Sequence, residues 1–212
     1  MFARKNTSAF LLLMFFLAGC GRLIPSGHQE NEITAWRQGA YRLDPDHASL
    51  VFSLDHLGFS NYVGRFNLLD ASLDFDPEKP LETRLFAEVA VTSLDVNNPS
   101  FAEELKGPSW FDAATFPTAY LESTGITLTG EQTAELQAKL TLKGTTHPVT
   151  FNVRFNGGAN NLLSGKYTLG FSAEGTIKRS DFGISYLVPA IGDEVKLQIS
   201  AEFLRVSDRI AE

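Results

Sequence analysis

The sequence predicts an all-β fold, an eight-stranded antiparallel β-barrel with a short helical and aromatic insertion. Three observations predict it. Apolar and polar residues alternate with a period of two along most of the chain after residue 40, as in half-buried strands. Turns rich in Gly, Pro, Asn and Asp separate these runs, and short connections suit an up-and-down barrel. One irregular segment, 97–117, interrupts the pattern.

The first 19 residues have the layout of a secretory signal peptide. Arg4 and Lys5 precede ten apolar residues, 9–18, a run too short for a membrane-spanning helix, which needs about 20 residues. Cys20 follows and is the only cysteine. A disulfide within the chain is therefore excluded, and an unpaired thiol in an exported protein needs another role. The alternative is an ordinary signal peptide with a cysteine that happens to fall near the cleavage site.

Residues 17–20, Leu-Ala-Gly-Cys, resemble the lipobox of bacterial lipoproteins. The resemblance implies that residues 1–19 are removed and that Cys20 receives a diacylglyceryl group and an acyl chain such as palmitate. The protein would then be anchored by lipid in the bacterial cell envelope, facing the periplasm. Gly21, where an Asp would signal retention, favours the outer membrane over the inner one by the same resemblance. Several acyl chains anchor a protein firmly, whereas one chain is marginal.

Residues 20–39 are polar and lack periodicity, which predicts a flexible, lipidated tether leading to a barrel domain over 40–207. Trp36 within this stretch either docks on the domain or lies at the membrane interface. These two placements remain open from the sequence.

The mature chain is acidic. The leader holds two of the 18 Lys and Arg residues and none of the 25 Asp and Glu residues, which leaves 16 minus 25, a net charge of −9 with His neutral. Such a charge repels phosphate backbones, so we expect no nucleic-acid partner.

Seven runs show the alternation most clearly: 50–54, 66–75, 83–91, 136–142, 149–155, 167–177 and 195–203. The phase changes midway through 66–75, which we interpret as a bulge. An eight-stranded barrel is either filled by its own side chains or holds one small ligand. If it holds a ligand, the lining comes from the inward faces, with these candidates: Leu50, Phe52, Leu85, Val89, Leu140, Leu142, Phe151, Val153, Phe171, Val195, Leu197 and Ile199. For any one of them the alternative is an ordinary core position.

The insertion predicts a short helix that begins near Ser100 and ends at Gly107-Pro108, because Gly and Pro stop helices. Trp110, Phe111 and Phe116 follow in a stretch too irregular for a strand. Such an aromatic segment either caps one mouth of the barrel or forms a small core of its own.

Four polar residues near predicted strand ends are candidate contacts for a ligand's head group: His47, His56, Arg179 and Asp181. For Arg179 and Asp181 the alternative is that they pair with each other or cap their turn.

Metal binding and catalysis find little support in the sequence. Asp44, Asp46 and His47 offer metal ligands, but one short run without a partner elsewhere in the chain is weak evidence, so we expect no metal. No serine lies in a nucleophile elbow and no Gly-rich loop opens a helix, so we expect no enzyme activity and no cofactor.

A series of short motifs resembles the YceI-like family of polyisoprenoid-binding proteins over about residues 41–206. The motifs lie, in this order, at 41–49 (YRLDPDHAS), 52–58 (FSLDHLG), 63–66 (VGRF), 74–77 (DFDP), 140–149 (LTLKGTTHPV), 177–183 (IKRSDFG) and 191–195 (IGDEV). The resemblance implies a lipocalin-like barrel that holds a long isoprenoid tail, as of a quinone precursor or polyprenyl lipid, in an internal tunnel.

The chain departs from the family pattern in the insertion. Many members have a His-Leu-Arg-like triplet where this sequence has Glu104-Leu105-Lys106, so the resemblance does not extend to a contact from that histidine. The function we expect is carriage or storage of an isoprenoid lipid by a lipid-anchored envelope protein. The alternative is an envelope stress or interaction lipoprotein whose barrel is filled and whose surface binds a protein partner.

Overall fold

The computed structural model describes residues 36–206. Cys20, the predicted leader and most of the predicted tether lie outside these residues. The long strands are β1 (Gly39–His56), β2 (Ser60–Phe66), β3 (Leu69–Phe75), β4 (Arg84–Ala90), β6 (Thr118–Leu128), β7 (Thr133–Leu142), β8 (Thr145–Asn160), β9 (Tyr167–Lys178) and β10 (Glu194–Arg205). The short elements are η2 (Pro80–Glu82), η3 (Val91–Ser93), β5 (Leu94–Asp95), α1 (Pro99–Leu105) and η4 (Arg179–Phe182).

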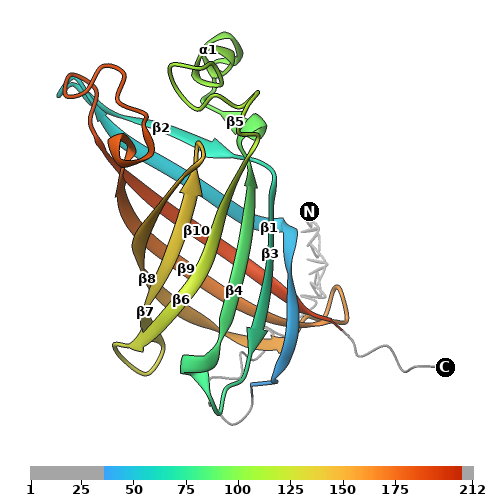
Figure 1. Ribbon diagram of the computed structural model, residues 1–212. Coiled ribbons are helices and arrows are strands. Elements are labelled where there is room, and N and C mark those ends of the chain that lie inside the picture. The colour runs from blue at the N-terminus through green and yellow to red at the C-terminus, as the bar shows by residue number, and fades with distance from the viewer. Residues whose placement is uncertain (1–35, 207–212) are drawn as a thin grey trace, which may run out of the picture.

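Eight antiparallel strands close into a barrel, as the alternation predicted (Figure 1). The sheet runs β10-β9-β8-β7-β6-β4-β3-β1, and β1 pairs with β10 to complete the circle. Closure removes the exposed strand edges that would otherwise favour aggregation. On its other edge, β1 pairs with two strands: residues 39–42 pair with β3, and residues 50–56 pair with β2. β2 and β5 therefore extend the sheet beyond the closed barrel.

The prediction of a single bulged strand over 66–75 is wrong. The structure has two strands there, because β2 ends at Phe66 and β3 begins at Leu69. The amides of Asn67 and Leu68 both donate to the side-chain oxygen of Ser93, at 3.1 and 3.0 Å. Ser93 therefore holds the corner, and the phase change in the sequence marks a change of strand.

β6 is absent from the runs singled out in the sequence, and its bulge explains why. Its register against β7 shifts between Ser123 and Gly125. The shift moves the apolar residues from the odd positions, such as Leu121, to the even positions Ile126 and Leu128. A bulge of this kind breaks the period-two pattern.

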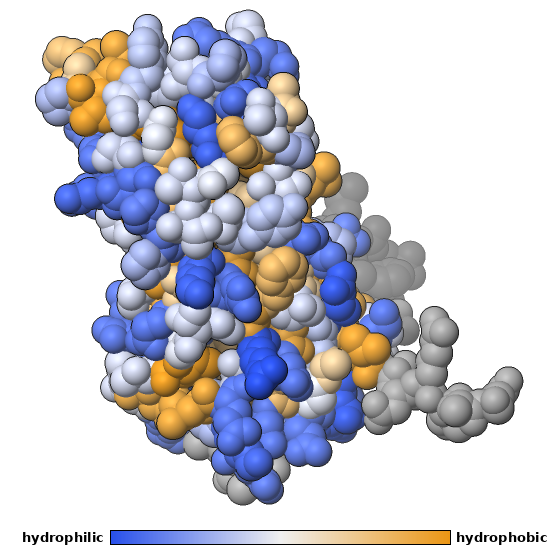
Figure 2. All heavy atoms as spheres, viewed as in Figure 1, coloured by the Kyte–Doolittle hydropathy of each residue, from blue (hydrophilic) through white to orange (hydrophobic). Residues whose placement is uncertain are grey.

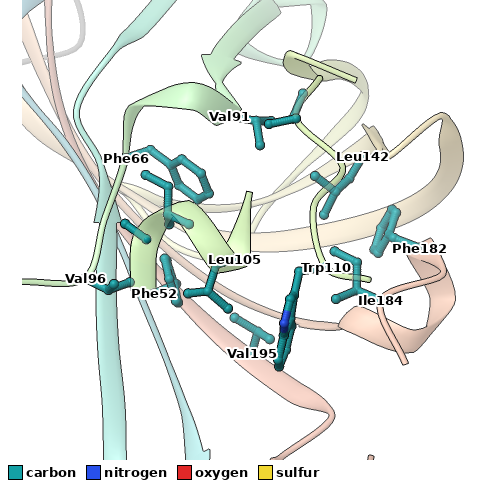
Figure 3. Packing of buried hydrophobic residues seen from close by; sticks show 14 residues of the cluster. Phe52, Phe66, Val91, Val96, Leu105, Trp110, Leu142, Phe182, Ile184 and Val195 are labelled. Carbon is teal, nitrogen blue, oxygen red and sulfur yellow. The ribbon is translucent and has the colours of Figure 1, made fainter. Parts of the chain in front are cut away.

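The insertion closes one end of the barrel, the first of the two alternatives from the sequence. α1 lies beyond the upper end of the strands in Figure 1. Asn98 caps it by accepting a hydrogen bond from the amide of Phe101, as N-cap residues do. Leu105 and Trp110 pack in one cluster with Phe52 of β1 and Leu142 of β7 (Figure 3). In the described part of the chain, no helix is long and apolar enough to cross a membrane.

Trp36 docks on the barrel, which decides between its two placements. Its side chain is 9% exposed, and its ring meets that of Phe155 edge-on at 4.2 Å between centroids. Phe75 and Tyr41 belong to the same cluster. Trp36 therefore packs at the end of the barrel where β1 begins.

Gly64 of β2 is required by the close approach of Phe52, its partner on β1. A Cβ at Gly64 would lie 2.3 Å from the ring of Phe52 and 2.9 Å from Val96. We expect Gly64→Ala to lower the free energy of unfolding by about 1–3 kcal/mol, since overpacking displaces side chains. Urea unfolding measures this. Gly170→Ala is the control, because there an added Cβ meets Asn156 at 3.5 Å; equal losses in both variants would contradict the role given to Phe52.

Candidate functional site

The barrel interior is hollow. One cavity of about 320 Å³ occupies the end near Trp36 and the turns after β3 and β6, and a second of about 250 Å³ lies beneath the insertion. Their walls are almost entirely apolar. Protein interiors are packed like organic crystals, with few voids larger than a water molecule. Apolar voids of this size are therefore too large to be packing defects.

The two cavities meet at a waist made of four side chains that belong to both walls. These four are Leu50, Val89, Leu140 and Leu197. They come from β1, β4, β7 and β10, strands spread around the barrel. A ring of shared wall residues means that the two cavities lie end to end along the barrel.

All twelve residues that the alternation selected for the lining lie on the cavity walls. Four form the waist, and the others divide between the larger cavity (Leu85, Phe151, Val153, Phe171 and Ile199) and the smaller one (Phe52, Leu142 and Val195). Eight of the twelve are only partly buried although they point into the barrel. Their remaining exposure is toward the internal void, as expected of a lining and unlike a filled core.

The smaller cavity carries most of the ionisable groups that could meet a head group. His56, Tyr62, Glu104 and Arg179 all contribute to its wall. His56 and Tyr62 lie at the β1–β2 hairpin with ring centroids 6.0 Å apart, and burial raises the pKa of the Tyr62 hydroxyl. Glu104 comes from α1.

Arg179 is buried and fixes the β9–β10 connection. Its guanidinium donates four hydrogen bonds of 2.8–2.9 Å to backbone carbonyls, and the acceptors are Ile184, Tyr186, Ile191 and Gly192. Burial lowers the pKa of Arg179, while the charge of Asp193 acts in the opposite direction. The side chain also lies over the ring of Trp110, 5.6 Å from its centroid. Arg179 therefore neither pairs with Asp181 nor is free for a ligand, and it shapes the cavity wall.

Asp193 holds the start of the same connection. Its carboxylate accepts hydrogen bonds from the amide and the hydroxyl of Ser180, at 2.9 and 2.7 Å. Partial burial raises the pKa of Asp193, but the two bonds from Ser180 and the charges of Arg179 and Lys178 outweigh it, and the net pKa is lowered.

The other two head-group candidates lie away from the cavities. Asp181 is exposed in η4. His47 is exposed on the outside of β1 and lies 2.9 Å from Asp44. The hydrogen bond to Asp44, followed by the charge of Glu202, raises the pKa of His47. Of the four candidates, the structure brings only His56 and Arg179 to a cavity.

The smaller cavity also has wall residues that the alternation could not select, because they lie in loops and in α1. Phe101, Trp110 and Phe111 come from the insertion, and Leu187 and Ile191 come from the β9–β10 connection. The aromatic density of 97–117 was the available signal for the first three.

An exposed apolar rim lies beside the smaller cavity. Figure 2 shows apolar side chains gathered at the upper left of the molecule, over the tip that Figure 1 assigns to the β1–β2 hairpin and the β9–β10 connection. The exposed residues of these segments include Phe59 (87%), Leu57 and Leu187, and Ile191 bridges to His56. Exposed apolar clusters of this kind are typical of contact sites.

A closed antiparallel β-barrel with two neighbouring apolar cavities belongs to the class of small barrels whose interior has room for a ligand. Within this class, the YceI-like domain model matches residues 41–203, and a UPF0312 protein of Pseudomonas paraeruginosa is 34% identical over 167 residues, 78% of this chain and 86% of the relative. The chain belongs to the YceI-like family.

Solved structures agree on the fold. BcnA of Burkholderia cenocepacia aligns with a TM-score of 0.69 at 24% identity, over 76% of this chain and 98% of BcnA. A polyisoprenoid-binding domain from Saccharophagus degradans, implicated in plant cell wall breakdown, aligns with a TM-score of 0.61 at 14% identity, over 80% of this chain and all of that domain. The lipocalin-like barrel expected from the sequence is confirmed.

Proposed function

We propose that this protein is a lipid-anchored, non-catalytic envelope protein that holds one long isoprenoid lipid inside its barrel for carriage or storage. The observation that carries the proposal is the pair of apolar cavities of about 320 and 250 Å³ joined at a waist of four side chains. A row of cavities along a barrel suits a long, thin and flexible apolar chain better than a compact ligand.

The energetics fit such a ligand without any charged anchor. Burial of each methylene contributes about 0.8 kcal/mol, so a tail of ~40 carbons has a gross transfer energy of tens of kcal/mol. Measured affinities saturate near about −18 to −21 kcal/mol. An apolar wall is therefore sufficient for tight binding, and the polar groups of the smaller cavity need only orient the head group.

Those polar groups favour an uncharged head, such as a quinone or phenol, over a phosphate. Arg179 is the only Arg or Lys on either cavity wall among the described residues, and four of its N–H groups already bond to carbonyls. Glu104 adds a carboxylate to the same wall, and its negative charge disfavours a phosphate in this cavity. His56 and Tyr62 offer hydrogen bonds to a neutral oxygen.

One structural neighbour supports the same proposal, because it is described as a polyisoprenoid-binding domain. The alternative, a filled barrel that serves only as a scaffold for a protein partner, conflicts with the volume of the cavities.

Mass spectrometry of bound lipid tests the proposal. Residues 20–212 carrying Cys20→Ala, expressed without the leader and purified without detergent, should release about one isoprenoid per chain on extraction with organic solvent, or should take up an added long-tailed quinone at that ratio. A clean extract together with no uptake of added quinone or polyprenyl lipid would overturn it.

For the anchor, we expect Cys20→Ala in the full chain to abolish incorporation of labelled palmitate and to leave the protein outside the lipoprotein pathway, either released from the membrane or retained with its leader uncleaved. The reason is that Cys20 supplies the only thiol of the chain for the diacylglyceryl group, and removal of the leader and acylation of the new α-amino group follow that step. Ser26→Ala, in the same tether, is the matched control and should keep the label. Label that still enters Cys20→Ala would show that the lipobox assignment is wrong.

A further inference from the structure

The pairing of β1 with β10, where the barrel closes, contains an unusual bulge. Leu43 pairs with Phe203 and Ala48 pairs with Ala201, so four residues of β1, 44–47, face the single residue Glu202 of β10. An ordinary bulge sets two residues against one. The extra residues bring the side chains of Asp44 and His47 close to Glu202. Glu202 lies more than 150 positions further along the sequence.

The three side chains have the spacing of a metal-binding site. The His47 Nδ1 atom lies 2.9 Å from the Asp44 Oδ2 atom, and the ligand atoms of Asp44, His47 and Glu202 all lie within 4.8 Å of one another. Bonds of about 2.0–2.2 Å from a metal to nitrogen and oxygen place neighbouring ligand atoms about 3–4 Å apart. Small side-chain adjustments would therefore bring all three onto one ion.

The site also has a defined support. A neighbouring backbone amide fixes the orientation of the Asp44 carboxylate, because its Oδ1 atom accepts a hydrogen bond from the amide of Asp46 at 3.2 Å. The side chain of Asp44 is 14% exposed. The carboxylates of Asp44 and Glu202 attract a cation by their charge, and the imidazole of His47 adds a nitrogen ligand. A nitrogen ligand favours first-row divalent metals over Ca²⁺ and Mg²⁺, which prefer oxygen alone.

We propose that Asp44, His47 and Glu202 form a divalent transition-metal site of the Zn²⁺ or Mn²⁺ type, with water in the remaining positions. The expectation of no metal from the sequence rested on the lack of a distant partner for the Asp44–His47 run, and Glu202 supplies that partner. Because Leu43, Ala48, Ala201 and Phe203 flank the site and line the larger cavity, a bound ion would join β1 to β10 at a wall of the lipid cavity.

The competing explanation is that His47 and Asp44 form only a hydrogen-bonded pair. Glu202 separates the two explanations, because Glu202→Gln leaves the His47–Asp44 bond in place and removes one anionic ligand. His47→Ala removes both the bond and the imidazole. Asp76→Asn is the matched control: Asp76 also accepts a backbone hydrogen bond, from Glu78, but lies in the turn after β3, outside the cluster.

The experiment is isothermal titration of the full chain, without a histidine tag and after chelator treatment, with Zn²⁺ and separately with Mn²⁺ at neutral pH. We expect one ion per chain, a rise in Tm that a chelator reverses, and affinity weakened at least about tenfold in Glu202→Gln and His47→Ala. Asp76→Asn should bind as the parent does. Absence of saturable binding of both ions at millimolar concentration, or equal binding in Glu202→Gln and the parent, would overturn the proposal.

Discussion

Leu140→Trp should reduce uptake of a long-tailed quinone at least about tenfold while the barrel remains folded. Leu140 belongs to the waist and lines both cavities. An indole there fills the passage between them, so a long tail can occupy one cavity at most. The barrel tolerates the larger side chain because the void next to Leu140 accepts it. Overpacking typically costs about 1–3 kcal/mol, and we expect the free energy of unfolding to fall by less than that.

Lys139→Trp is the matched control. Lys139 precedes Leu140 on β7, and successive side chains of a strand point to opposite faces, so Lys139 is exposed on the outside of the barrel. Equilibrium dialysis with the quinone and thermal unfolding measure uptake and stability in both variants. If Leu140→Trp binds the quinone as tightly as Lys139→Trp, the tail does not pass the waist.

Arg179→Met should lower the free energy of unfolding by about 3 kcal/mol or more, the largest effect of a single side chain that we expect. The methionine keeps much of the length of the side chain but leaves four carbonyl acceptors without their donor. Each unsatisfied buried polar group costs about 1–3 kcal/mol. The total stays below the sum for four such groups because water reaches some of the carbonyls once the β9–β10 connection loosens. Arg179 is itself 5% exposed, so little rearrangement can replace it.

Urea unfolding checks this expectation, with Arg154→Met as the control because Arg154 is exposed on β8. Uptake of quinone should also fall in Arg179→Met, since Leu187 and Ile191 of the connection line the smaller cavity. A loss of stability no greater than that of Arg154→Met would show that the four hydrogen bonds do not hold the connection.

The inward face of the barrel was predictable because strand geometry leaves it no freedom. Once Leu140 or Phe151 lies in a regular strand, alternation decides which side chains face inward, and all twelve predicted lining residues lie on the cavity walls. The alternation fails only where the chain departs from that geometry. The corner held by Ser93 and the bulge in β6 are two such places.

The polar groups were harder to predict because long-range contacts decide their roles. From the sequence, Arg179 was a candidate for a head-group contact or for a pair with Asp181 or a cap of its turn, yet its partners are carbonyls up to 13 residues away, at Gly192. His47 lies outside the barrel because of the bulge opposite Glu202. Glu104 reaches the smaller cavity only because the insertion folds over the barrel end. The sequence around each of these residues does not indicate these contacts, because the contacts form only when distant segments come together in the fold.

A crystal structure of the protein with a long-tailed isoprenoid quinone would test directly whether the barrel encloses the lipid. We expect one tail that runs through the larger cavity, past Leu50 and Leu140 at the waist, and into the smaller cavity, with its head group near His56 and Tyr62. A tail confined to one cavity or bound on the outer surface, with the waist closed by side chains, would contradict it.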